Sequence, residues 1–380
     1  MKYRDYLNLF LSFGESGSGG GSGGGSSEPM RDVNFIDYDG TVVNSYSKED
    51  FLAMTAMPEN PSHDGLVAQG WNWSFTDAQN YVQEYGELNV GQMYTTDTGE
   101  TKIYITIDSN APSNRKNMAV RFQSSEANNV TLDWGDGTAP VTAGATTATE
   151  YQHTYVNTGN YIIKLKVNSG TIFFNTIVYA TLPYAASNIR KVEIGDNVTS
   201  ISTSSFNGCY ALSSISISNS VIEIGAYAFQ SCFCLKSIVI PISANFMGNG
   251  QFTYCHSLES ISLSKGVTSL GLNFTKECES LVSISIPDSV IMLAGYVFQK
   301  CYSLKSLTIP KSIQSIGTRA FADCPNMGEY HIKPLSVPSL ANNGFTNIFS
   351  DCKIYVPSES VDAYKTATNW STYASYIYGE

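Results

Sequence analysis

Apolar residues alternate with polar ones through the middle of the chain, between Lys102 and Leu182. Gly, Asn or Pro residues separate the runs that show this spacing. A period of two places successive side chains on opposite faces of a strand, so the pattern predicts a β-sandwich over residues 101–182. The runs are Ile103, Ile105 and Ile107, then Val130 and Leu132, then Ile163, Leu165 and Val167.

The second half of the chain repeats one unit. Its cysteines recur every 23 residues, and a last one follows after 28: Cys209, Cys232, Cys255, Cys278, Cys301, Cys324 and Cys352. A Phe precedes most of them by three residues, at Phe206, Phe229, Phe252, Phe298, Phe321 and Phe349. A Leu follows by three, at Leu212, Leu235, Leu258, Leu281 and Leu304. One such turn cannot bury its apolar side alone, so the period predicts a solenoid of stacked coils that share one core.

The fourth unit departs from this pattern. It places Phe274 one residue early and Thr275 at the aligned position. We therefore expect a local distortion in that coil.

The repeat unit from Phe229 to Pro241 resembles the BspA-like leucine-rich repeats of surface proteins, of the kind found in gut bacteria and their phages. The tail, with Val361 to Tyr364 and Trp370, is similar to the C-terminal cap of that family. The resemblance implies a mainly β fold, with a leucine-rich-repeat solenoid over residues 183–352 and a cap over residues 353–380. It also implies adhesion as the activity.

A second resemblance lies in the predicted sandwich. The run from Asp133 to Thr138, with His153 to Tyr155 further on, resembles the PKD family of immunoglobulin-like modules. From the residues alone, the run predicts a tight turn, in which glycines tolerate positive φ and the aspartates accept bonds from nearby amides. Two carboxylates are too few for calcium, which takes six to eight oxygen ligands, so no metal site is predicted.

Residues 29–100 predict a small mixed α/β module. A β-like run covers Val33 to Val43, a helix begins near Ser47, and a second helix covers Thr76 to Tyr85. Ser47 and Thr76 are the expected N-caps. Between the helices stand Trp71, Trp73 and Phe75, which we assign to the core because aromatic side chains bury large areas.

The first fifteen residues predict an amphipathic docking peptide, and residues 16–28 a flexible Gly/Ser linker. A secretory signal is the rival interpretation of the N-terminus, but polar residues interrupt its apolar region and no small-residue cleavage site follows. An engineered linker would have the same composition, so the origin of residues 1–27 stays open. The docking side chains are Tyr3, Tyr6, Leu7, Phe10 and Phe13.

One short motif suggests catalysis. The run from Phe35 to Val43 looks like the first motif of haloacid-dehalogenase-type phosphatases, with Asp37 as nucleophile and Asp39 as acid/base. That chemistry also needs a later Lys and a further acidic pair on a doubly wound sheet, which a segment ending near residue 100 does not supply. A strand followed by an Asp-Gly turn is the preferred interpretation, and no catalytic residue or cofactor is predicted.

All eight cysteines lie in the repeat half. Equivalent positions on stacked coils have parallel side-chain vectors, whereas a disulfide needs converging ones, so we expect buried free thiols. Cys234 lies off the column and is the exception. Zinc is not expected, since one ligand per coil lacks the paired spacing of structural sites.

Two surfaces of the solenoid are candidates for binding. The position after each column cysteine is predicted to face outward, and its aromatic members Tyr210, Phe233, His256 and Tyr302 could bind a receptor or glycan. The alternative, that these rings fill gaps between coils, stays open. The second candidate is the ladder Lys236, Glu259, Val282 and Lys305 with Ser216, Val239, Ser262, Ser285 and Thr308. It is weakly charged and is not preferred.

Composition narrows the partners. Among 380 residues, 22 are Lys or Arg and 33 are Asp or Glu, a net charge of −11, which gives no basic field for nucleic acid. Apolar stretches are far shorter than the roughly 18 residues that predict a membrane span. We therefore predict a non-enzymatic receptor-binding protein, most simply a phage virion component attached through its N-terminal peptide. The partner would be a bacterial surface protein or glycan, and homo-oligomers are possible. The alternative is a secreted or cell-surface bacterial adhesin.

Overall fold

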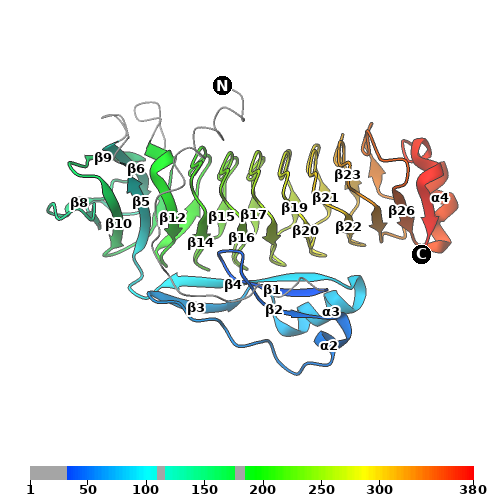
Figure 1. Cartoon of the computed structure of the whole chain (residues 1–380), viewed down its shortest axis with the longest axis horizontal. Helices are drawn as coiled ribbons and strands as arrows, with labels where there is room; N and C mark the ends of the chain where they lie inside the picture. Colours follow the sequence, from blue (N-terminus) through cyan, green and yellow to red (C-terminus); the bar gives the residue numbers. More distant parts are fainter. Residues whose placement is uncertain (1–31, 109–115, 176–184) are drawn as a thin grey trace.

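The computed structural model describes residues 32–108, 116–175 and 185–380. Figure 1 shows three parts: a two-sheet body at one end, a long solenoid, and a small module along one side of the solenoid. The chain is mainly β, as the sequence predicted. The predicted docking peptide and the Gly/Ser linker lie outside the described residues.

The N-terminal module is one four-stranded sheet with two helices. The order is β2-β1-β4-β3, in which only β1 and β4 run parallel. Ser47 caps α2, as predicted, by accepting a bond from the backbone N–H of Asp50. The second cap differs from the prediction: α3 begins one residue before Thr76, and Ser74 accepts from the N–H of Asp77. The elements are β1 (Val33–Ile36), β2 (Val42–Tyr46), α2 (Lys48–Leu52), β3 (Leu66–Trp71), α3 (Phe75–Tyr85) and β4 (Leu88–Thr96).

The module has its own hydrophobic core between the sheet and the helices. Phe35, Phe51 and Val82 are fully buried there, and Trp71 and Trp73 are nearly so, which confirms the assignment of the tryptophans. The other face of the sheet carries the alternate residues of β1 and β4, Asn34, Asn89 and Gly91. All nine residues of β4 are buried, so this second face is covered as well.

The predicted sandwich strands form, and their two sheets continue into the solenoid. Strand β5 pairs with β10 on one side and with β12, the first solenoid strand, on the other. Strand β11 likewise joins β6 to β13. This body therefore closes the first coil of the solenoid. Its strands are β5 (Thr101–Ile107), β6 (Asn117–Ser124), β7 (Val130–Asp133), β8 (Val141–Ala143), β9 (Thr149–Thr154), β10 (Gly159–Val167) and β11 (Ile172–Phe174).

The turn motif in this body has the predicted structure. Gly135 and Gly137 have φ of 76° and 86°, and the Asp133 carboxylate accepts from the N–H of Gly135 at 2.8 Å. The Asp136 carboxylate lies 2.7 Å from Nε2 of His153, and the His153 ring stacks on Trp134.

Each solenoid coil supplies one strand to a front sheet and one to a back sheet. The front strands are β12 (Ile189–Glu193), β14 (Ser214–Ser216), β16 (Ser237–Val239), β18 (Ser260–Ser262), β20 (Ser283–Ile284), β22 (Ser306–Ile309), β24 (Glu329–Ile332), β26 (Lys353–Val356) and β27 (Ile377–Gly379). The back strands are β13 (Val198–Ile201), β15 (Glu223–Ile224), β17 (Phe246–Met247), β19 (Ser269–Leu270), β21 (Met292–Leu293), β23 (Ser315–Ile316) and β25 (Ser339–Leu340). Parallel pairing between coils confirms the predicted repeat.

A column of Phe rings fills the core between the sheets. Phe206, Phe229 and Phe252 stack nearly parallel, with centroids 5.5 and 5.7 Å apart. In the fourth coil the Phe274 ring stands at 89° to Phe252. The backbone keeps the left-handed residues found in the other coils, Asn273 and Glu277, so the expected distortion is confined to the ring.

The last coil corrects one expectation. Phe349 does not join the core column and is 53% exposed. Phe345 takes the position, stacking on Phe321 at 4.9 Å, because the longer spacing before Cys352 shifts the register. Beyond this coil lies the cap with α4 (Val361–Thr366), and the buried Trp370 donates its indole N–H to the carbonyl of Pro338. The cap closes the open end of the solenoid, as predicted.

Short 3-10 turns complete the chain: η2 (Ala185–Asn188), η3 (Ser358–Ser360) and η4 (Ser371–Tyr376).

Candidate functional site

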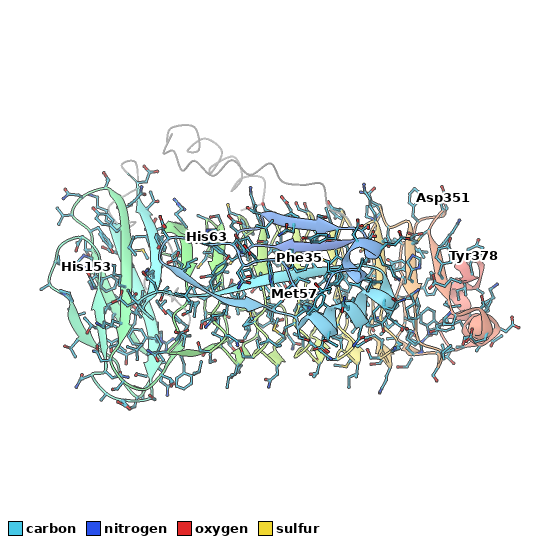
Figure 2. All side chains as sticks on the ribbon, turned by 90° about the horizontal axis from the view of Figure 1, so that it is seen from below. Phe35, Met57, His63, His153, Asp351 and Tyr378 are labelled. Carbon is cyan, nitrogen blue, oxygen red and sulfur yellow. The ribbon has the colours of Figure 1, made fainter. Side chains whose placement is uncertain are left out.

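The front sheet of the solenoid is covered by the N-terminal module, which lies along it in Figure 2. Five members of the predicted ladder are buried beneath it or beside it: Ser216, Val239, Ser262, Ser285 and Thr308. The other four stay exposed: Lys236, Glu259, Val282 and Lys305. The sequence placed this ladder on the surface. The covering of this face is the main feature that the sequence did not predict.

The module is bound in register with the repeat. Asn72 donates to the carbonyl of Ile240, Trp73 to that of Leu263, and Tyr81 to that of Ile286, at 3.2, 2.9 and 2.7 Å. The three acceptors are equivalent positions of consecutive coils, 23 residues apart. Three side chains of the module therefore donate hydrogen bonds to equivalent carbonyls on three consecutive coils.

Hydroxyl groups complete this docking interface, by which we mean the contacts between the module and the front sheet. Asn89 accepts at its carbonyl from Ser262, donates its backbone N–H to Ser285, and donates its side-chain amide to Ser283. These distances lie between 2.8 and 3.1 Å. The polar groups of Asn89 are thus paired with serines of the repeat, which offsets the cost of burying them.

Gly91 sets how closely the two parts approach. A Cβ at this position would lie 2.5 Å from a Val239 methyl carbon and 2.9 Å from the Cβ of Ser262. No side chain fits there without moving the module, so the glycine is required by contact and not by backbone conformation.

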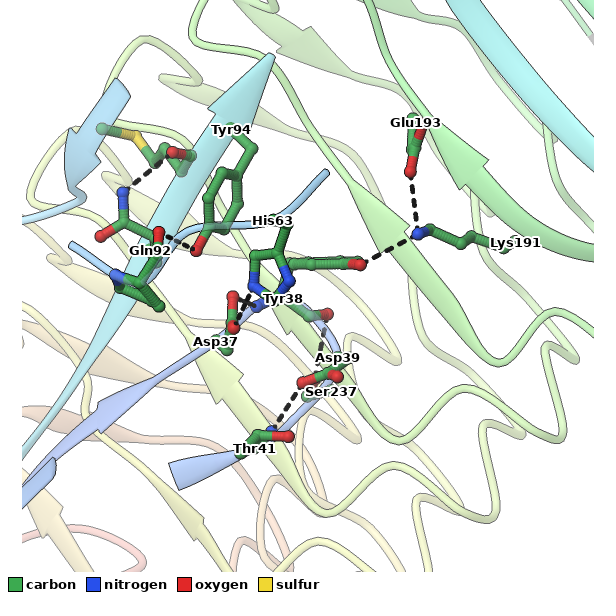
Figure 3. A network of polar contacts seen from close by, with 12 residues as sticks. Asp37, Tyr38, Asp39, Thr41, His63, Gln92, Tyr94, Lys191, Glu193 and Ser237 are labelled. Atoms are coloured by element: carbon green, nitrogen blue, oxygen red, sulfur yellow. Dashed lines mark hydrogen bonds and ion pairs between the residues drawn. The ribbon is translucent and has the colours of Figure 1, made fainter. Parts of the chain in front are cut away.

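A polar network joins the module to the first solenoid strand (Figure 3). The Lys191 ammonium donates to the Tyr38 hydroxyl at 2.9 Å and contacts the Glu193 carboxylate at 2.8 Å. Tyr104 also donates to Glu193. Burial lowers the pKa of Lys191, but the bonds to Glu193 and Tyr38 outweigh it and raise the pKa, so the ammonium stays charged.

Asp37 and Asp39 shape a hairpin turn. Strands β1 and β2 are antiparallel, and the turn between them is closed by the N–H of Asp37 on the carbonyl of Thr41. The Asp37 carboxylate is buried against His63 at 2.6 Å, and Asp39 accepts from the N–H of Thr41. The preferred interpretation as a strand and an Asp-Gly turn is confirmed. No group of three metal-ligating side chains exists among the described residues.

The aromatic row begins as a stack. Tyr210 and Phe233 stack with centroids 4.9 Å apart, and His256 follows Phe233 at 5.3 Å. His256 is only 7% exposed and lies 3.6 Å from Glu279, which separates it from Tyr302. Tyr210, Phe233 and Tyr302 are half-buried. We call the row of positions that follow the column cysteines the solenoid edge.

The column cysteines are buried free thiols, as predicted, and Cys234 is exposed. Their chemistry explains the residue choice: Cys255 donates to the carbonyl of Phe229 at 3.1 Å, and Cys278 to that of Phe252 at 3.0 Å. The thiol therefore adds a second hydrogen bond to a buried carbonyl of the preceding coil, which also accepts from a backbone N–H. Burial raises the pKa of Cys255 to about 12, so the thiol is neutral and unreactive.

No helix in the described part of the chain is long and apolar enough to cross a bilayer.

Comparison with known proteins places the repeats in a family. The family described as BspA type leucine rich repeat region matches residues 182–302 and 273–369, with six copies. No curated protein matches the chain.

Several solved structures are similar over part of the chain. A leucine-rich repeat protein from Bacteroides ovatus is 25% identical over 44% of this chain, with a TM-score of 0.36. One from Eubacterium ventriosum is 21% identical over 46% of this chain and 47% of its own, with a TM-score of 0.37. A leucine rich cell surface protein from Faecalibacterium prausnitzii is 21% identical over 44% of this chain and 60% of its own, with a TM-score of 0.31. The chain matches about half, 51%, of the B. ovatus protein. On the family match, the region from residue 182 to residue 369 belongs to the BspA-type leucine-rich-repeat family.

Proposed function

We propose that this protein is a non-enzymatic adhesin, secreted or held at a bacterial cell surface, that binds a protein or glycan through its leucine-rich repeats. The family match of the repeats supports this proposal over the virion interpretation, because the BspA-like repeats resemble those of bacterial surface proteins. The virion interpretation rests on the docking peptide, which lies outside the described residues.

The covered front sheet is the observation that directs the proposal to one surface. Because the module covers the front sheet, that strand face is not available to a partner, and we place binding at the solenoid edge. Tyr210 and Phe233 form a half-buried aromatic pair on that edge, and Tyr302 adds a third ring further along. Rings present a large contact area at low entropic cost.

A binding assay on intact surfaces tests the edge. Labelled full chain is titrated onto bacterial and epithelial cells, beside the variant Tyr210→Ser/Phe233→Ser. We expect at least tenfold weaker binding by the double variant. Tyr227→Ser, which removes a half-buried ring from another corner of the coil, is the matched control and should bind normally. Equal binding by all three proteins would contradict the proposed edge.

Peptide mapping of native material separates the two locations. The adhesin interpretation expects the chain in cell envelopes or medium. Intact Met1–Glu15 peptide on purified phage particles would instead support a virion protein.

A further inference from the structure

An open hollow of about 360 Å³ lies at the junction of the module with the last solenoid coils. Lys48 and Glu87 line it from the module, and Thr308, His331 and Lys333 line it from the front sheet. This volume lies at the lower end of the roughly 300–1,000 Å³ of small-molecule sites, which often form where two parts of a protein meet. The hollow, which we call the junction pocket, is therefore complete only while the module is docked.

Its walls are polar and are held in place. The Glu380 carboxylate contacts the His331 imidazole at 2.7 Å and the Lys333 ammonium at 2.8 Å. The His331 ring stacks on Tyr355, with centroids 5.2 Å apart and planes 14° apart. Burial raises the pKa of the Glu87 carboxyl, which also forms a side-chain hydrogen bond with Thr308. Donors and acceptors are thus fixed around a small space.

The chemistry of the walls selects the ligand. Carboxylates of Asp32, Glu87 and Glu380 outnumber the ammonium groups of Lys48 and Lys333, which disfavours a phosphate or other anion. Among the residues that the structure describes, no Val, Leu, Ile or Met side chain lines this pocket, which disfavours an aliphatic ligand. A lining that holds both donors and acceptors suits a ligand with a hydroxyl on nearly every carbon, since a hydroxyl can donate and accept.

A ligand longer than the junction pocket can extend into a neighbouring groove. A groove of about 890 Å³ adjoins the pocket and shares Lys333 and Glu380 with it. Its further walls come from Ile313, Leu335 and Val337, so the groove is more apolar than the pocket. We propose that the junction pocket binds the terminal sugar of an oligosaccharide, whose following residues lie in the adjoining groove.

The junction pocket is separate from the aromatic edge, so an experiment can contradict one of the two proposed sites and leave the other standing. Labelled full chain is screened against immobilised bacterial-wall and mucin oligosaccharides, with a peptide panel printed beside them. The strongest glycan is then titrated free in solution by saturation-transfer NMR. Ser306→Trp places a large ring in the pocket wall, and we expect it to weaken binding at least tenfold.

Lys305→Trp is the matched control, because it puts the same ring on the exposed neighbouring residue outside the pocket lining. We expect it to bind as the original chain does. Thr308→Val removes one hydroxyl at nearly constant volume and should weaken binding several-fold. Melting temperatures show whether each variant is folded. Binding of no glycan at millimolar concentration, binding of peptides only, or equal effects of the two tryptophans would overturn the proposal.

Discussion

The solenoid and the N-terminal module are held by different forces. One continuous hydrophobic cluster runs from Ile103 in the two-sheet body, through the Phe and Cys columns, to Ile377 in the cap. The module has a separate cluster, centred on Phe35 and Val82, and meets the solenoid through hydrogen bonds of Asn, Trp, Tyr and Ser side chains. Apolar burial therefore builds each part, and paired polar groups join them.

The two parts should differ in the free energy needed to open them. Opening the solenoid would expose apolar surface, which costs free energy in proportion to its area. Opening the docking interface would mainly return amides and hydroxyls to water, where they bond equally well. We therefore expect the module to open at a lower free energy than the solenoid, and the following experiments test that comparison.

The largest effect is expected inside the solenoid. Phe252→Ala removes a fully buried ring from the stacked column and should lower the free energy of unfolding by about 3–5 kcal/mol. Phe349→Ala is the control, since that side chain is 53% exposed, and it should change the value by less than about 0.5 kcal/mol. Urea titration followed by circular dichroism measures both. Similar losses for the two variants would contradict the assigned core column.

A smaller and more local effect is expected at Gly91. Gly91→Ala drives a methyl group into Val239 and Ser262, and such overpacking costs about 1–3 kcal/mol. Hydrogen exchange should accelerate in β4 and leave the solenoid strands protected. Adding Val239→Ala removes the two nearest methyls, although not the contact with Ser262, and should restore part of the protection. Accelerated exchange throughout the chain would show that the two parts open together.

The thiols give a third comparison within one coil. Cys255→Ala removes the thiol hydrogen bond to the Phe229 carbonyl, which keeps its bond from the N–H of Cys232, and should cost about 1 kcal/mol. Cys234→Ala, at an exposed position, should cost little. A thiol reagent should modify one cysteine of the native chain and all eight after denaturation. Rapid modification of several native thiols would contradict the buried column.

The sequence predicted the repeating coils of the solenoid but not the docking of the N-terminal module on the front sheet. The period of 23 residues was sufficient for the solenoid, because each coil buries the same columns as its neighbours. The covered front sheet was missed for a physical reason. Asn34, Asn89 and Gly91 alternate with the apolar residues of β1 and β4, and a polar strand face has this pattern whether it meets water or another polar surface. Only the pairing of Asn89 with Ser262 and Ser285 distinguishes the two, and that pairing is not local in sequence.

The candidate site shows the same limit. The spacing of the aromatic row followed from the repeat, but its predicted outward direction is wrong for His256, which is only 7% exposed. The longer spacing before Cys352 is visible in the sequence, whereas the replacement of Phe349 by Phe345 in the core column is seen only in the structure. The junction pocket combines Glu87 with Thr308 and Lys333, residues more than two hundred positions apart, so no local motif marks it.

The smallest effect is expected from an ion pair at the edge of the docking interface. Lys265 lies against the Asp77 carboxylate, and this contact, with a bond from Ser74, lowers the pKa of Asp77. Because the pKa is lower in the docked state, the contribution is present above the ordinary pKa of an aspartate and is lost as the pH falls through the lowered value. The side chains are 50% and 33% exposed, so Lys265→Met should weaken docking by at most about 1 kcal/mol.

Hydrogen exchange in the module, measured from pH 5 down to pH 3 and corrected for the intrinsic rate, tests this contribution. The original chain should lose protection with acid and with added salt, and Lys265→Met should respond less to both. Lys353→Met, on strand β26 beyond the module, is the control and should respond as the original chain does. If acid and salt leave all three proteins unchanged, this ion pair does not stabilise docking, and the bonds from Asn72, Trp73 and Tyr81 to the carbonyls of successive coils hold the module without it.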